Sequence, residues 1–177
     1  MKQHVVSALV ENRAGTLSRV SGLFSRRGFN IDSLTVGETE DPSISRMTIA
    51  VTGADSVLEQ IIKQLGKLVD VIAVRELDSA SCVRREIMLV KVRIDEKTRP
   101  GVLEVVSIFR SRVIDVSPAT ITVEATGDIS KLESLLLLLR PYGVLELART
   151  GLVALERGSS VLTESSVPQV PVLSISN

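Results

Sequence analysis

Apolar residues recur along the chain with a spacing that changes in a regular order. Continuous or alternating runs of Val, Ile, Thr and Leu predict strands, whereas apolar residues three and four positions apart predict helices with one buried face. Through the first 77 positions these spacings predict the order β-α-β-β-α-β. The predicted strands are 4–10, 31–36, 46–52 and 69–77, and the predicted helices are 17–27 and 57–68.

The ends of the two predicted helices carry signals of their own. Arg26 and Arg27 precede Gly28, and cations in the last turn followed by glycine are typical of a helix end. Ser56 and Glu59 have the spacing of a capping box, which predicts the start of the second helix.

The same order of spacings returns after a short polar segment, so the sequence contains an internal repeat. The segment DSASC at 78–82 is small and polar, as expected of a linker. Glycine and apolar residues in the first helix of each repeat match at one constant offset. The second set of predicted strands is 86–94, 113–118, 119–126 and the strand-like stretch 143–156, with a turn near Thr150 and Gly151, and the predicted helices are 98–112 and 128–140.

A β-α-β-β-α-β order predicts the ferredoxin-like arrangement, in which two helices cover one face of a four-stranded antiparallel sheet. We therefore expect an α+β protein with two ferredoxin-like domains. Strand positions on both faces are apolar, so the other half of the chain or a second copy must cover the face without helices. On this ground we predict an oligomer. The expected boundaries are 1–78 for the first domain, 79–84 for the linker, 85–157 for the second domain and 158–177 for a weakly ordered tail.

Composition excludes several classes of function. Lys and Arg together number 21, as do Asp and Glu, so the net charge is zero, whereas a nucleic-acid-binding protein needs a basic face. The predicted strands also lack the aromatic residues on which RNA-binding ferredoxin-like domains stack bases. The longest apolar run, LLLLL at 135–139, is far shorter than the roughly 20 residues that span a membrane, and the N-terminus lacks a signal-peptide pattern. We expect a soluble cytoplasmic protein with no nucleic-acid or membrane partner.

No combination of residues in the sequence predicts a catalytic centre or a metal site. His4 is the only histidine and has no partners at ligand spacing, so we interpret it as structural or exposed. Cys82 is the only cysteine and has no nearby base. The turns NRAG and TRPG lack the phosphate-loop pattern, and no serine lies in a nucleophile elbow. We therefore expect no catalytic site and no bound cofactor in this chain.

The turn between the first strand and the first helix is the best candidate for binding. A helix N-terminus presents free N–H groups and the positive end of the helix dipole, both of which favour an anion. Gly15 permits close approach to the backbone, and Asn12 offers a donor and an acceptor. A small amino acid would suit this turn, and Asn30 and Ile31 of a facing subunit would complete the site. The alternative is that the turn only caps a helix.

Several segments of the sequence resemble a known family. The stretch ENRAGTLSRVSGLFSRRGFNI, followed by SRMTIAV and VRREIMLVKV, is similar to the small regulatory subunit of acetolactate synthase (acetohydroxyacid synthase). The similarity is dense through residues 3–92 and looser as far as 157. The resemblance implies an N-terminal ACT domain that pairs side by side in a homodimer, and a second, C-terminal ferredoxin-like domain.

The resemblance implies a regulatory role rather than a catalytic one. It implies that the chain binds a large catalytic subunit that uses thiamine diphosphate, Mg²⁺ and FAD, activates it, and confers feedback inhibition in branched-chain amino-acid biosynthesis. L-Valine, and more weakly leucine and isoleucine, would bind between two ACT domains. The implied effector residues are Asn12, Ala14, Gly15, Thr16 and Leu17 of one chain and Asn30 and Ile31 of its partner. The alternative is a free-standing amino-acid-sensing ACT protein that regulates a different target.

Overall fold

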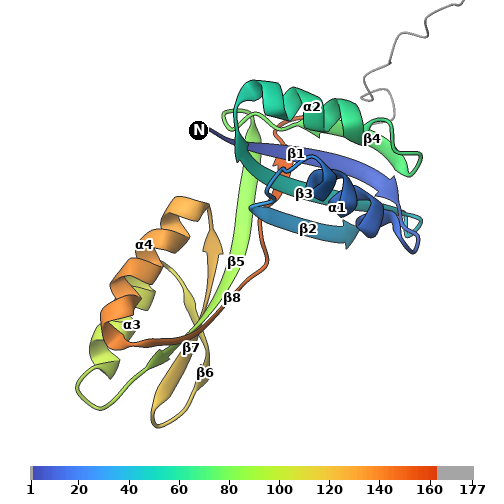
Figure 1. The fold of residues 1–177 in the computed structure, drawn as a ribbon. Helices are drawn as coiled ribbons and strands as arrows, with labels where there is room; N and C mark the ends of the chain where they lie inside the picture. Colours follow the sequence, from blue (N-terminus) through green and yellow to red (C-terminus); the bar gives the residue numbers. More distant parts are fainter. Residues whose placement is uncertain (1, 163–177) are drawn as a thin grey trace, which may run out of the picture. The chain divides into compact units, whose positions relative to one another are not determined.

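Two β-α-β-β-α-β units follow one another in the computed structural model, which describes residues 2–162 (Figure 1). The order of elements confirms the predicted α+β class with two antiparallel sheets. The first unit contains β1 (Lys2–Glu11), α1 (Thr16–Arg26), β2 (Ser33–Glu38), β3 (Ile44–Gly53), α2 (Asp55–Leu65) and β4 (Val71–Glu76). The elements that follow are β5 (Cys82–Arg93), α3 (Arg99–Ile108), β6 (Arg112–Val116), β7 (Thr120–Gly127), α4 (Ile129–Leu139), the short 3₁₀ helix η1 (Arg140–Tyr142), β8 (Val144–Arg149) and β9 (Val153–Glu156).

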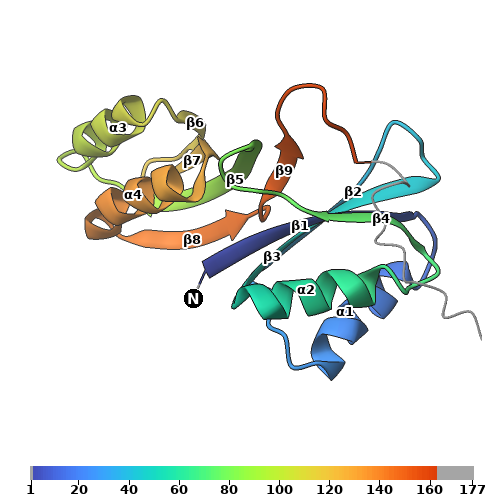
Figure 2. The same ribbon diagram turned by 90° about the horizontal axis from the view of Figure 1, so that it is seen from above.

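The sheet of the first unit has the strand order β2-β3-β1-β4, and every neighbouring pair is antiparallel. Strands β1 and β3 pair along their whole length, from Lys2 opposite Gly53 to Glu11 opposite Ile44. Helices α1 and α2 lie on the same face of this sheet (Figure 2). The core between them is Val6, Ala8, Val10, Val20, Leu23, Phe24, Met47, Ile49, Val51, Leu58, Ile61, Leu65, Val71 and Val74.

The opposite face of this sheet is buried as well, as its apolar residues predict. Val5 of β1 lies opposite Ala50 of β3 on that face, and both residues are almost completely buried. Residues 154–162 belong to the same compact unit. Nη1 of Arg75 donates a hydrogen bond to Oε2 of Glu156 at 2.6 Å. Because Arg75 lies opposite Ser7 on this face, a later part of the chain contacts the face within a single copy.

The second sheet has the strand order β6-β7-β5-β8, and β9 also pairs with β5. Helices α3 and α4 lie on one face of it (Figure 1). The apolar positions that the helical and strand patterns predict form one cluster. That cluster is Met88, Val90, Val92, Ile94, Val102, Val105, Val106, Ile121, Val123, Ala125, Leu132, Leu135, Leu136 and Leu139.

The described chain divides into two compact units near the predicted linker. One unit runs as far as Val83 and includes the described residues 154–162, and the other is Arg84–Val153. β5 begins at Cys82, inside the predicted linker 79–84, and Cys82 is buried. Most of the predicted tail, residues 163–177, lies outside the described residues.

The start of α2 corrects one prediction. The helix begins at Asp55 with Ala54 as its N-cap, and no side chain caps it. The predicted capping box is therefore wrong, because the chain turns into the helix before Ser56. Glu59 instead lies 3.9 Å from Lys63, one turn further along the helix.

Candidate functional site

The turn from β1 into α1 leaves the start of the helix open. Gly15 is the N-cap of α1, and no side chain hydrogen-bonds to the first amides of the helix. Within residues 2–162, no hydrogen bond engages the backbone N–H groups of Ala14, Gly15, Leu17 or Ser18. Four free donors thus lie at the positive end of the helix dipole, where a small anion binds favourably.

Gly15 is required at this turn for two reasons. Its φ is +88°, a left-handed conformation that L side chains rarely adopt. A Cβ built on Gly15 would lie only 2.9 Å from Nη1 of Arg19. Any side chain at Gly15 therefore strains the backbone and displaces the Arg19 guanidinium.

A bidentate ion pair holds that guanidinium beside the turn. Nε of Arg19 donates to Oδ2 of Asp70 at 2.5 Å, and Nη2 donates to Oδ1 at 2.9 Å. The Asp70 side chain is 4% exposed and the Arg19 side chain is 45% exposed. The hydrogen bond from Arg19 lowers the pKa of Asp70 below its ordinary value, so the carboxylate stays ionised.

Asn12 is oriented at the same turn by hydrogen bonds to its amide nitrogen. Its Nδ2 donates to Oε1 of Glu38 at 3.1 Å and to the carbonyl of Pro42 at 2.9 Å. Its backbone N–H donates to the carbonyl of Ser43 at 2.7 Å. Both amide protons are therefore used within the described chain, and Oδ1 is left as an acceptor for a ligand's N–H.

The remaining residues predicted for this half of the site surround the open amides. Thr16 is buried beneath the turn, and its hydroxyl oxygen lies 3.4 Å from Nη2 of Arg19. Ala14 and Leu17 are exposed. The five effector residues that were predicted to come from one chain thus all lie in this turn or at the start of α1.

The structure does not bring Asn30 and Ile31 to this turn within one chain. The N–H of Asp32 donates to the carbonyl of Ala50, near the end of β3. The turn before α1 instead hydrogen-bonds to Ser43, immediately before β3 begins. A strand rises about 3.3 Å per residue, so these two anchoring points are about 23 Å apart. The two predicted halves therefore lie at opposite ends of the sheet.

Comparisons with known proteins match both units. Residues 6–73 match the family described as "AHAS small subunit-like ACT domain", and residues 85–158 match "Small subunit of acetolactate synthase". The chain is 54% identical to the probable acetolactate synthase small subunit of Methanothermobacter thermautotrophicus, over 90% of this chain and 95% of that protein. This chain belongs to the acetolactate synthase small-subunit family.

Other members of the acetolactate synthase small-subunit family agree in sequence and in fold. The chain is 54% identical to the acetolactate synthase small subunit of Mycobacterium bovis, over 89% of this chain and 94% of that protein. It is 46% identical to the crystal structure of the acetolactate synthase small subunit from Thermotoga maritima, with a TM-score of 0.84 over 90% of this chain and all of that one. The first unit is thus the ACT domain, and the predicted resemblance is confirmed.

In the C-terminal unit a side chain holds the turn before the corresponding helix, although none caps the first amides of α3 itself. Oδ1 of Asp95 accepts hydrogen bonds from the N–H of Lys97 at 2.9 Å and from the N–H and hydroxyl of Thr98 at 2.7 and 2.8 Å. These bonds lower the pKa of Asp95 below its ordinary value. A Cβ on Gly101, the counterpart of Gly15 in the repeat, would lie 2.6 Å from the hydroxyl oxygen of Tyr142. The chain therefore fills this turn with its own groups.

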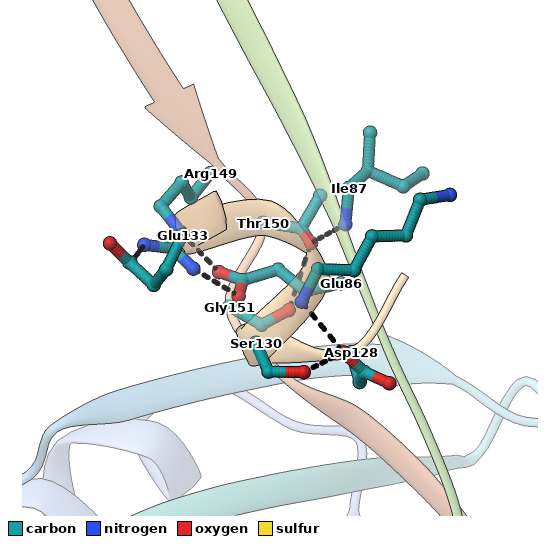
Figure 3. Close-up of polar contacts among 9 residues, drawn as sticks. Glu86, Ile87, Asp128, Ser130, Glu133, Arg149, Thr150 and Gly151 are labelled. Atoms are coloured by element: carbon teal, nitrogen blue, oxygen red, sulfur yellow. Dashed lines mark hydrogen bonds and ion pairs between the residues drawn. The ribbon is translucent and has the colours of Figure 1, made fainter. Parts of the chain in front are cut away.

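The C-terminal unit also contains a second bidentate arginine (Figure 3). Nε and Nη2 of Arg149 donate to the carboxylate of Glu86 at 3.1 and 2.9 Å, and Nη1 donates to Oε1 of Glu133 at 2.5 Å. The Glu86 side chain is 8% exposed. Both glutamates raise the pKa of Arg149 above its ordinary value. All three nitrogens of this guanidinium are thus occupied by protein carboxylates.

The other residues that could act in catalysis or metal binding do not form a site among the described residues. His4 is buried, with Nδ1 3.1 Å from Glu76 and Nε2 3.5 Å from Asp55. Cys82 is buried. Among residues 2–162, no three His, Cys, Asp or Glu side chains are grouped as a metal site would require. None of the helices in that range is long and apolar enough to cross a membrane.

Sequence reasoning missed Arg19 and Asp70. Arg19 lies on the polar face of α1, where its residue type carries no special signal. Asp70 falls within the predicted strand 69–77, and a carboxylate among the apolar residues of 69–74 was the one available sign that it needs a partner. In the structure Asp70 directly precedes β4.

Proposed function

We propose that this chain is a regulatory subunit of acetolactate synthase that binds L-valine between the ACT domains of a homodimer. The observation that carries the proposal is the position of the two half-sites at opposite ends of the edge strand β2. Asn12 hydrogen-bonds to Glu38, the last residue of β2, whereas Asn30 and Ile31 precede its first residue, Ser33. β2 lies at the edge of the sheet, with β3 beside it.

Pairing of this edge across a two-fold axis would complete the site. Two copies of an edge strand that pair antiparallel place the start of one strand beside the end of the other. Asn30 and Ile31 of one protomer would then approach the turn of Asn12 and Gly15 in its partner. The same contact would cover the exposed β2 edge, which natural proteins rarely leave open. Each dimer would contain two equivalent sites.

The chemistry of the turn suits a small α-amino acid. The ligand carboxylate would accept hydrogen bonds from the open amides of α1, and its ammonium group would donate to Oδ1 of Asn12. Ile31 of the partner would supply an apolar wall for the side chain. One methylene in an apolar pocket changes affinity by only about 1–3 kcal/mol, so leucine and isoleucine should bind more weakly than valine rather than not at all.

The proposed target is the large catalytic subunit, which would carry thiamine diphosphate, Mg²⁺ and FAD. The relatives, each named as a small subunit of acetolactate synthase, support this partner. In this proposal the chain activates the catalytic subunit and makes it sensitive to valine. Valine can act only if it binds two states of the assembly with different affinity, and such coupling is typically about 1–3 kcal/mol.

Two measurements on the full chain test the proposal. Calorimetric titration should show one L-valine bound per chain and no heat with D-valine. Reconstitution with the catalytic subunit of the same organism should raise acetolactate formation and make it inhibitable by L-valine. If the chain binds L-valine but captures a different enzyme or regulator and leaves acetolactate formation unchanged, the free-standing sensor is correct instead. Absence of binding to both the free chain and the reconstituted assembly would contradict the effector site.

A further inference from the structure

We infer that Arg19 recognises the carboxylate of the effector and that Asp70 is the positioning residue that aims it. The inference rests on the proposed function, because it concerns the same site. It assigns a role to two residues outside the predicted effector set. It also defines the ligand more narrowly, as an amino acid with a free carboxylate rather than an amide or an amine.

The first step is the use of the guanidinium nitrogens. Asp70 accepts from Nε and Nη2 of Arg19, which leaves Nη1 with no hydrogen-bond partner among residues 2–162. Nη1 is also the atom that lies closest to the position of a Cβ on Gly15, at 2.9 Å. The unoccupied edge of the guanidinium is therefore directed at the turn that carries the four open amides.

The second step is that this edge is both fixed and accessible. The Asp70 carboxylate is almost completely buried, so the bidentate pair holds the guanidinium in one orientation. The Arg19 side chain is 45% exposed, so a ligand can reach it from solvent. A carboxylate at the open amides would thus meet a charged donor that is already oriented for it.

The third step is the precedent inside the same chain. Arg149 binds Glu86 through Nε and Nη2, as Arg19 binds Asp70, and its Nη1 donates to a second carboxylate, that of Glu133 (Figure 3). A guanidinium engaged by one carboxylate can therefore still bind another on its remaining edge. Around Arg19 the described chain supplies no second carboxylate on that edge, and the effector would supply it.

The test compares L-valine with L-valinamide, which keeps the ammonium group and side chain but lacks the anionic carboxylate. Calorimetry on the full chain would measure the dissociation constants of both ligands, with valinamide measured by displacement of valine. In the unsubstituted chain valine should bind more tightly than valinamide. In Arg19→Gln the affinity for valine should fall at least tenfold, as expected for a lost charged hydrogen bond, while that for valinamide changes little. The preference for valine should therefore largely disappear.

Two further variants separate recognition from folding. Arg26→Gln removes an exposed arginine from the last turn of the same helix and should leave both affinities unchanged. Arg19→Lys keeps the positive charge but loses the planar guanidinium and its paired N–H donors. It should retain only part of the preference for valine over valinamide. Retention of the full preference for valine in folded Arg19→Gln would overturn the inference and leave the proposed function intact. Failure of the unsubstituted chain to bind valine, alone or with its catalytic subunit, would overturn both.

Discussion

Arg19 in the ACT domain and Arg149 in the C-terminal unit bind a buried carboxylate with the same two nitrogens. They differ at the third nitrogen, which donates to Glu133 in one case and faces the open turn at Gly15 in the other. No side chain caps the first amides of either α1 or α3. The turns before them differ, because Asp95 accepts hydrogen bonds from Lys97 and Thr98 before α3 and Tyr142 lies over Gly101, whereas among residues 2–162 no such groups occupy the turn at Gly15. In the C-terminal unit, residues of the chain itself thus bind the third arginine nitrogen and occupy the turn before the first helix. In the ACT domain, the corresponding groups have no such partners in the described chain. We propose that the effector binds at these unsatisfied groups.

The largest effect is expected from removing Arg149 from its carboxylate network in the C-terminal unit. Arg149→Met leaves Glu86 buried without its partner, and loss of one member of such a pair should lower the free energy of unfolding by about 3 kcal/mol. Denaturant unfolding followed by circular dichroism would measure the change. The affinity of the folded variant for valine should be unaltered. A loss below about 1 kcal/mol would mean that this network contributes little to the C-terminal unit.

Blocking the open turn should abolish binding instead of folding. Gly15→Asp forces a side chain onto a φ of +88° and places a carboxylate where the ligand's carboxylate should bind. We expect the dissociation constant for valine to rise at least a hundredfold, equivalent to about 2.7 kcal/mol, and valine inhibition of the reconstituted enzyme to be lost. Gly143→Ala is the matched control, because Gly143 has a φ of +94° in the C-terminal unit. Full valine inhibition of the Gly15→Asp enzyme would show that the site lies elsewhere.

A smaller effect should appear in the pH dependence of stability. The folded pKa of Asp70 is lowered by its hydrogen bond from Arg19, so its contribution to stability is present above the ordinary value of 3.8. This contribution is lost as the pH falls from there toward the folded pKa. The difference in Tm between the unsubstituted chain and Asp70→Asn should therefore be greatest above about pH 4 and shrink in more acidic solution. A difference that stayed constant with pH would argue against ionisation of Asp70 as its source.

The smallest effect is expected from removing the carboxylate that binds Nη1 of Arg149, so that this arginine resembles Arg19. Glu133→Ala frees Nη1 of Arg149, but the Glu133 side chain is 49% exposed, so stability should change by no more than about 1 kcal/mol. The variant should not gain a second valine site, because Asp128 already caps the start of α4. Titration to more than one valine per chain would show that a free arginine edge suffices for binding without open amides.

The sequence allowed the element order, both sheets and most of the core to be predicted, because apolar spacing determines which face of each element is buried. It also located the turn around Gly15, since glycine before an amphipathic run marks a helix start. It could not predict the start of α2, where Ala54 rather than Ser56 is the N-cap. The two positions are only two residues apart, and a helix boundary is not defined by sequence to that precision.

The contrast between the two units also lay beyond sequence reasoning. Gly15 and Gly101 occupy equivalent positions in the repeat, yet Gly15 is an N-cap and Gly101 lies inside α3. What differs is the set of partners contributed from distant positions, such as Asp70 for Arg19 and Tyr142 beside Gly101. Such pairs depend on tertiary structure, and a single sequence does not specify them.

The most direct test is a titration of the isotopically labelled full chain with L-valine, followed by amide nuclear magnetic resonance. We predict saturable shifts of the N–H signals of Ala14, Gly15, Leu17 and Ser18, little change at Lys97 and Thr98, and no response to D-valine. Saturable binding of L-valine that leaves the four amides before and within the first turn of α1 unperturbed would contradict the assignment of this open turn as the effector site.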